Sequence, residues 1–171
     1  MKTDQLPVSE YSEFNATYIR AAENVDMIEE LEICLHDFIR FVQNISMDKF
    51  DYRYAEGKWT IKDIIQHIID TERIFAYRAL RISRNDKTPL PGFEENDFVA
   101  NTNANDRNIQ DLLAELSAVR HTTLFLFKSF SEEQLKRIGT ASNAYISVRA
   151  IGFIIIGHQK HHQKVFQDRY L

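Results

Sequence analysis

The sequence contains one cysteine, three prolines and five glycines among 171 residues. A single cysteine excludes an intramolecular disulfide, and the apolar helical surroundings of Cys34 predict a reduced interior thiol, which favours the cytoplasm. The polar first residues lack the apolar core of a signal peptide, and the longest apolar run, residues 150–157, is too short to cross a bilayer. We therefore expect a soluble cytoplasmic protein that has no membrane partner.

A concentrated positive charge is also missing. The 21 basic and 25 acidic residues give a formal charge of −4, and the basic residues are scattered along the chain. Nucleic-acid binders carry a basic patch or stripe. We expect neither DNA nor RNA as a partner.

Few glycines and prolines, together with apolar residues at helical spacing, predict an all-α protein. We expect a four-helix bundle with long crossover connections, forming one domain over residues 1–171. Asp26, Thr60 and Ser147 are candidate helix N-caps. The four long helices are expected at residues 26–45, 60–84, 108–130 and 147–168.

The remaining segments are connections. Residues before position 26 should form a shorter helix or a wrap, and residues 131–135 a short helical turn. Pro89, Pro91 and Gly92 exclude a continuous helix in the connection that follows residue 84, so a long loop should cross the bundle there. Long loops often carry function.

The last helix carries the strongest functional signal. His158 and His162 are four residues apart and fall within its apolar stripe, so their rings lie on one face about one turn apart. Burying a polar ring without a partner costs about 1–3 kcal/mol. A shared metal ion would offset that cost, although two core histidines without a metal are the plainer alternative.

A third ligand must come from another helix, and His67 is the best candidate. Three neutral imidazoles leave an open coordination position, as in catalytic zinc sites. Asp63 or Asp70 could accept the second ring proton of His67.

Further candidates surround these three. Asp70, Glu72 and His161 are candidate catalytic bases near an open position. Glu72 projects into an apolar stripe and needs an arginine partner. The candidates for that partner are Arg78, Arg81 and Arg120. We expect His36 and His121 to be ordinary residues on helix surfaces. Trp59 is expected to anchor the start of a helix.

Other bundle chemistries are excluded by spacing. The sequence has no Glu-x-x-His repeat of di-iron bundles and no His-Glu-x-x-His motif of zincins. A phosphate-binding glycine loop and a serine nucleophile elbow are also absent. A mononuclear three-histidine site remains.

Three segments together resemble the DinB/YfiT-like superfamily of damage-inducible four-helix proteins. They are YAEGKWTIKDIIQHIIDTERIFAYRALRISRNDKTPLPGF, LLAELSAVRHTTLFLFKSF, and GTASN followed by GHQKHHQKVFQDRYL. The resemblance implies an up-down-down-up bundle and a divalent metal, zinc or nickel being favoured, held by His67, His158 and His162. It also implies a homodimer and, by similarity to thiol-dependent relatives, a low-molecular-weight thiol as co-substrate.

The leading hypothesis is therefore a metal-dependent thiol S-transferase that joins a thiol to an electrophile in detoxification or stress response. Arg78 and Arg81 could hold the carboxylates of the thiol. The first alternative is a metal-dependent hydrolase with an activated water. The second is a non-enzymatic, stress-associated bundle whose metal serves structure.

Overall fold

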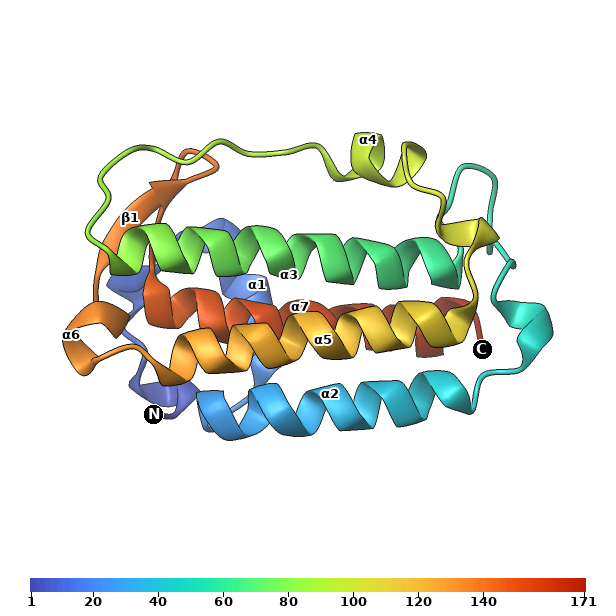
Figure 1. Ribbon diagram of the computed structural model, residues 1–171, viewed down its shortest axis with the longest axis horizontal. Helices are drawn as coiled ribbons and strands as arrows, with labels where there is room; N and C mark the ends of the chain where they lie inside the picture. Colours follow the sequence, from blue (N-terminus) through green and yellow to red (C-terminus); the bar gives the residue numbers. More distant parts are fainter.

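Four long helices lie along the longest axis of the molecule in a computed structural model that describes all 171 residues (Figure 1). The α-helices are α1 (Glu13–Ala22), α2 (Met27–Gln43), α3 (Ile61–Ser83), α4 (Glu95–Ala100), α5 (Ile109–Lys128), α6 (Glu132–Leu135) and α7 (Val148–Arg169). Of these, α2, α3, α5 and α7 form the bundle, and short 3-10 turns occur near the N-terminus and in the connections.

The helix directions confirm the expected topology. In Figure 1, α2 and α7 run in one direction along the bundle, and α3 and α5 run in the other. Because α3 and α5 are parallel, residues 84–108 must return along the whole bundle to connect them, and α4 lies in this crossover. The fold is thus an up-down-down-up four-helix bundle.

Local capping explains where the long helices begin. The Asp26 carboxylate accepts hydrogen bonds from the first turn of α2, and Ser147 accepts one from the first turn of α7. Thr60 and Asp63 cap α3 reciprocally, each side chain accepting from the other's backbone N–H. Such side chains satisfy helix N–H groups that have no partner within the helix. The predicted starts of these three helices are confirmed to within one residue.

The apolar stripes of the four helices meet in the bundle interior. Phe38, Ile65, Leu112 and Phe166 come from α2, α3, α5 and α7 in turn, and each is fully buried. Burial of each such side chain contributes about 1.5–3 kcal/mol. Cys34 is buried as a free thiol, as predicted. No helix combines the length and the apolar character needed to cross a membrane.

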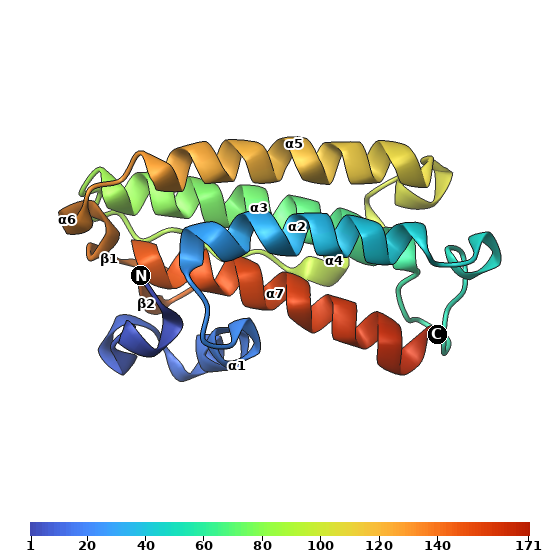
Figure 2. The same cartoon turned by 90° about the horizontal axis from the view of Figure 1, so that it is seen from below.

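The N-terminal helix α1 packs beside α7 (Figure 2). Gly157 makes the close approach possible, since a Cβ atom there would lie 1.8 Å from the carbonyl oxygen of Tyr18. The contact places Tyr18 against the ring of His158. The segment before α2 therefore forms a helix that contacts His158 and does not simply wrap the bundle.

A β-hairpin that the sequence reading did not predict connects α6 to α7. Strands β1 (Ile138–Ala141) and β2 (Ala144–Ser147) are antiparallel and joined through Ser142 and Asn143. Both turn residues have positive φ, of 50° and 60°, as in a type I′ turn. The crossover pairs with β1 through two hydrogen bonds between Leu90 and the hairpin. Four-residue strands are too short for alternation to stand out against helical patterns.

Candidate metal centre and its cavity

Three histidine rings meet between α3 and α7. Nε2 of His158 lies 3.0 Å from Nε2 of His67 and 3.1 Å from Nε2 of His162. One nitrogen from each ring lies within 4.8 Å of the others. The four-residue spacing on α7 brings two of the rings together edge-on, and the packing of α3 against α7 supplies the third.

This arrangement fits one divalent ion. In a tetrahedral site, nitrogens that bind the same zinc ion at 2.0–2.1 Å are separated by roughly 3.3 Å. The two separations from Nε2 of His158, 3.0 and 3.1 Å, are close to this value. Burial lowers the pKa of His67 to about 4. Burial, and then the neighbouring histidines, hold the pKa values of His158 and His162 well below the usual range. All three rings are neutral at pH 7, the form that binds metal.

The Nδ1 atoms of His67 and His162 face away from the cluster and are poorly satisfied. Nδ1 of His67 lies 3.4 Å from the hydroxyl of Thr71, and buried Nδ1 of His162 has no hydrogen-bond partner. The expectation that Asp63 or Asp70 would accept from His67 is wrong, because each carboxylate is held elsewhere. Asp63 accepts from Thr60 and Asn105 and pairs with Arg53, whereas Asp70 accepts from Gln66 and pairs with Arg73.

The ring of His162 has one polar neighbour in the protein, Nε2 of His158 at 3.1 Å from its own Nε2. A buried nitrogen without a partner costs about 1–3 kcal/mol. With a metal ion on Nε2, Nδ1 of His162 would carry the ring proton and would lack the acceptor that metal-bound histidines usually have. The meeting of the three Nε2 atoms, and not Nδ1, thus favours a metal ion.

The structure does not place Glu72 in the site. Its carboxylate receives two hydrogen bonds from Arg120, of 2.8 and 2.9 Å, and both side chains are almost fully buried. Arg120 also donates to the carbonyl of Leu31 and to Gln159. The partner of Glu72 is thus Arg120, not Arg78 or Arg81, and the pair ties α2, α3, α5 and α7 together.

Three other predicted site residues, Asp70, Arg81 and His161, do not line the cavity that opens beside the three rings. Asp70 is partly buried, and burial raises its pKa. Arg81 hydrogen-bonds Asp86 and Tyr77 on the surface, which leaves it unsuited to the predicted cofactor role. His161 packs edge-on against His162 and Tyr18 without lining the cavity beside them.

A cavity of about 410 Å³ opens beside the three histidines. Arg78 lines it, as does Trp59, whose ring centroid lies 4.9 Å from that of His67. Trp59 is therefore a wall of the site as well as a residue at the start of α3. The other lining residues are Phe14, Asn15, Tyr18, Thr71, Phe75, Gly92, Phe93, Glu95, Ala141, Ser142, Ala144 and Ile146.

Sequence reasoning missed several of these residues because α1, α4 and the hairpin supply them. Tyr18 packs edge-on against His158, and its pKa is raised by burial and by the charge of Glu95. Glu95 is the one carboxylate that lines the cavity. In the sequence, Glu95 was indicated only by its position in the long connection after residue 84, which was expected to carry function. Tyr18 and Ser142 gave no comparable signal.

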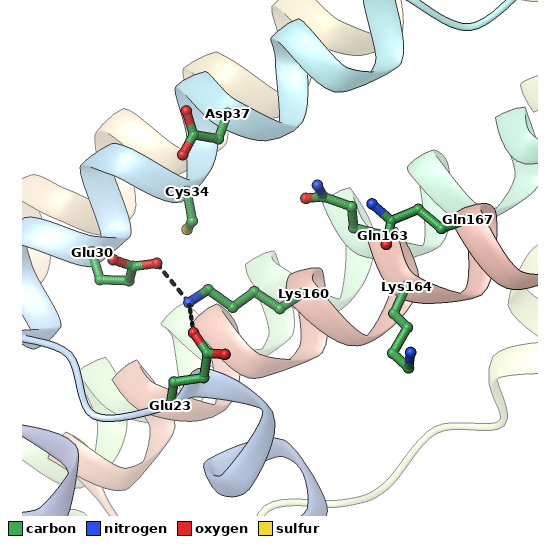
Figure 3. Close-up of a pocket in the computed structure, with 8 residues that line it drawn as sticks. All are labelled: Glu23, Glu30, Cys34, Asp37, Lys160, Gln163, Lys164 and Gln167. Atoms are coloured by element: carbon green, nitrogen blue, oxygen red, sulfur yellow. Dashed lines mark hydrogen bonds and ion pairs between the residues drawn. The ribbon is translucent and has the colours of Figure 1, made fainter.

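A second cavity, of about 310 Å³, lies between α2 and α7 (Figure 3). Its central cation, Lys160, is held by Glu30 at 2.8 Å and Glu23 at 3.4 Å. The Cys34 thiol at its base is buried, and burial raises its pKa, so the thiolate is disfavoured. The charge of Lys160 in this second cavity is already compensated by the two glutamates, and the cavity contains no cluster of metal-binding side chains.

The fold and the three-histidine cavity define a class of four-helix bundles that carry a histidine cluster between two helices. Residues 30–166 match the model of the DinB superfamily, and the chain belongs to this family. The resemblance found in the sequence is thereby confirmed.

Two relatives have known descriptions. A protein of Oceanobacillus iheyensis named "Putative metal-dependent hydrolase" is 22% identical over 139 residues, which cover 80% of this chain and 79% of the relative. The structure of YfiT from Bacillus subtilis, described as "a probable metal-dependent hydrolase with an unusual four-helix bundle topology", matches with a TM-score of 0.73. The match has 16% sequence identity and covers 95% of this chain and 90% of YfiT, so it supports the fold.

Proposed function

We propose that His67, His158 and His162 hold one divalent metal ion, zinc or nickel, and that the protein is a metal-dependent enzyme acting on small molecules. The observation that carries the proposal is the meeting of three buried, neutral imidazoles at the wall of an open cavity. A purely structural metal site is usually closed by four protein ligands, and only three are present here.

The leading activity is transfer of a low-molecular-weight thiol to an electrophile, in detoxification or stress response. When bound, a divalent ion lowers the pKa of a thiol or a water molecule and makes it a stronger nucleophile. The predicted bases Asp70, Glu72 and His161 do not line the cavity. A thiol that is already deprotonated needs no such base. Phe14, Phe75 and Phe93 supply an apolar surface for the electrophile.

Hydrolysis is the second candidate, and Glu95 favours it. Its carboxylate lines the same cavity as the histidines and faces solvent, where it can accept a proton from water. The descriptions of both relatives as metal-dependent hydrolases agree with this alternative.

Two assays on zinc-loaded protein without a histidine tag test both activities. One follows conjugation of several thiols, including cysteine and glutathione, to monochlorobimane, and the other follows hydrolysis of p-nitrophenyl acetate. His158→Gln should abolish whichever of the two activities the protein shows. His121→Gln, on the exposed side of α5, should leave that activity unchanged. Glu95→Gln should reduce hydrolysis by about 100-fold or more but leave thiol transfer largely intact, because general base catalysis contributes 10²–10⁴-fold.

A protein that binds metal tightly but has neither activity would favour the third hypothesis, a non-enzymatic, stress-associated bundle. The homodimer stays a prediction as well. Measurement of the molar mass in solution by light scattering would test it.

A further inference from the structure

Three arginines are buried in this protein, and only two have a carboxylate partner. Arg120, with 0% of its surface exposed, pairs with Glu72, and Arg149, with 9% exposed, pairs with Glu10. Arg78, with 6% exposed, forms no ion pair. The bundle thus compensates two of its buried guanidinium charges internally and leaves the third without an anion.

The hydrogen bonds of Arg78 use only one of its nitrogens. Nη2 donates to the carbonyl oxygen of Pro91 and to the hydroxyl of Ser142, both at 2.9 Å. Nε and Nη1, which carry three further N–H groups, have no acceptor in the protein. These nitrogens are not sealed into the core, because the one fully buried side-chain nitrogen or oxygen without a partner is Nδ1 of His162. They remain accessible where Arg78 lines the cavity.

No side chain around Arg78 forms an ion pair that compensates its charge. Burial lowers the pKa of Arg78, but a guanidinium remains protonated in proteins. The ring of Phe75, with its centroid 5.8 Å from the guanidinium carbon, offers a cation–π contact and no negative charge. Glu95 lines the same cavity, but the hydrogen bonds of Arg78 go to Pro91 and Ser142 and it forms no ion pair with Glu95. A buried cation without an opposite charge is costly, so a ligand anion is the missing partner.

The shape and lining of the cavity define the rest of the ligand. Its walls include the rings of Phe14, Phe75, Phe93 and Trp59, which favour an apolar body. A single guanidinium compensates one negative charge, as on a carboxylate. A doubly charged phosphate would leave one charge in apolar surroundings.

We propose that the cavity binds a small organic carboxylate with an apolar or aromatic body, and that Arg78 recognises its carboxylate group. The proposal names the substrate class of the proposed enzyme and rests on that function only for the chemistry at the histidines. Recognition of the carboxylate by Arg78 does not require the metal.

Trp59, the sole tryptophan, lines the cavity and provides the signal for a binding experiment. Its fluorescence is followed during titration with 3-phenylpropionate and with the neutral isostere 3-phenylpropanamide, on protein with and without zinc. A charge-assisted hydrogen bond should make the carboxylate bind at least about tenfold more tightly than the amide. Arg78→Met should abolish this preference in zinc-free protein without weakening amide binding. In zinc-loaded protein the carboxylate can also bind the open position of the metal, so the zinc-free form decides.

Two control variants separate recognition from structure. Ser142→Ala removes a hydrogen bond of Arg78 and keeps its charge, so the preference for the carboxylate should remain. Arg84→Met removes an exposed arginine at the end of α3 and should behave as the wild type. A preference lost in Ser142→Ala would indicate that Arg78 acts only by holding the loop.

In zinc-free protein, equal affinity for the two probes, a preference that survives Arg78→Met, or no saturable binding of either probe would overturn the proposal. Failure of the proposed metal function has a different signature. In that case zinc does not bind at the histidines, while the Arg78-dependent preference is still observed in zinc-free protein.

Discussion

Nε2 of His67 and Nε2 of His158 lie 3.0 Å apart, although 91 positions separate the two residues in the chain. The contact joins the first third of α3 to the middle of α7 at a buried point. Two neutral imidazoles can share at most one hydrogen bond there, whereas a metal ion could bind both nitrogens and the third from His162.

Substitution of any of the three histidines should remove the metal. We expect His67→Ala, His158→Ala and His162→Ala each to weaken zinc binding by at least about 100-fold, since the remaining two ligands form an incomplete site. Calorimetric titration and elemental analysis of untagged protein measure the effect. His36→Ala, at an exposed position on α2, is the matched control. Full zinc binding by His67→Ala would show that the cluster is not the metal site.

The metal-free protein should lose stability in mild acid. The pKa of His67 is lowered to about 4 by burial, whereas in the unfolded chain it is near 6.5. The unfolded state therefore binds more protons below pH 6.5, and the contribution of neutral His67 is lost progressively between pH 6.5 and about 4. The loss attributable to His67 is on the order of 3 kcal/mol or less.

Urea denaturation of metal-free protein at pH 7 and pH 5 measures this effect. His67→Asn, which cannot be protonated in this range, should show a smaller decrease in the free energy of unfolding than the wild type. An equal decrease in both proteins would contradict the assignment of the acid sensitivity to His67.

Breaking the pair of Glu72 and Arg120 should destabilise the fold. Glu72→Gln leaves the buried guanidinium without its counter-charge, for which we expect a loss of about 3–5 kcal/mol in the free energy of unfolding. Asp37→Asn removes the exposed ion pair with Arg40 and should cost less than about 1 kcal/mol. Thermal and urea denaturation compare the two variants. A stable Glu72→Gln protein that has lost only activity would instead support the predicted catalytic role.

Gly157→Ala should separate α1 from α7. The added Cβ would meet the carbonyl oxygen of Tyr18 at 1.8 Å, so the helix backbones must move apart. Overpacking of this kind costs about 1–3 kcal/mol. Gly92→Ala is a milder comparison, since its Cβ would meet the movable Ser142 hydroxyl at 3.3 Å. Equal stability of the two variants would argue against the close helix contact as a determinant of the fold.

Much of the fold could be read from the sequence because helix formation is local. Asp26, Thr60 and Ser147 marked helix starts through hydrogen bonds that span only three residues. The hairpin was missed because its strands are four residues long and its pairing with Leu90 joins segments about 50 residues apart. Such pairing leaves no periodic signal.

The same distinction separates the predicted site residues. The placement of His158 and His162 on one face follows from helical periodicity alone. The choice of Arg120 as the partner of Glu72 does not, because three arginines were available and only packing of α5 against α3 selects one.

The sequence by itself determined four amphipathic helices, their N-caps and a pair of histidines on the buried face of the last one, since all of these depend on residues within one or two turns. Tertiary structure decided that His67 meets this pair, that Tyr18 and Trp59 form the walls beside it, and that Arg78 keeps an uncompensated charge in the cavity. These features depend on contacts between helices, whose geometry is set by the packing of the whole core.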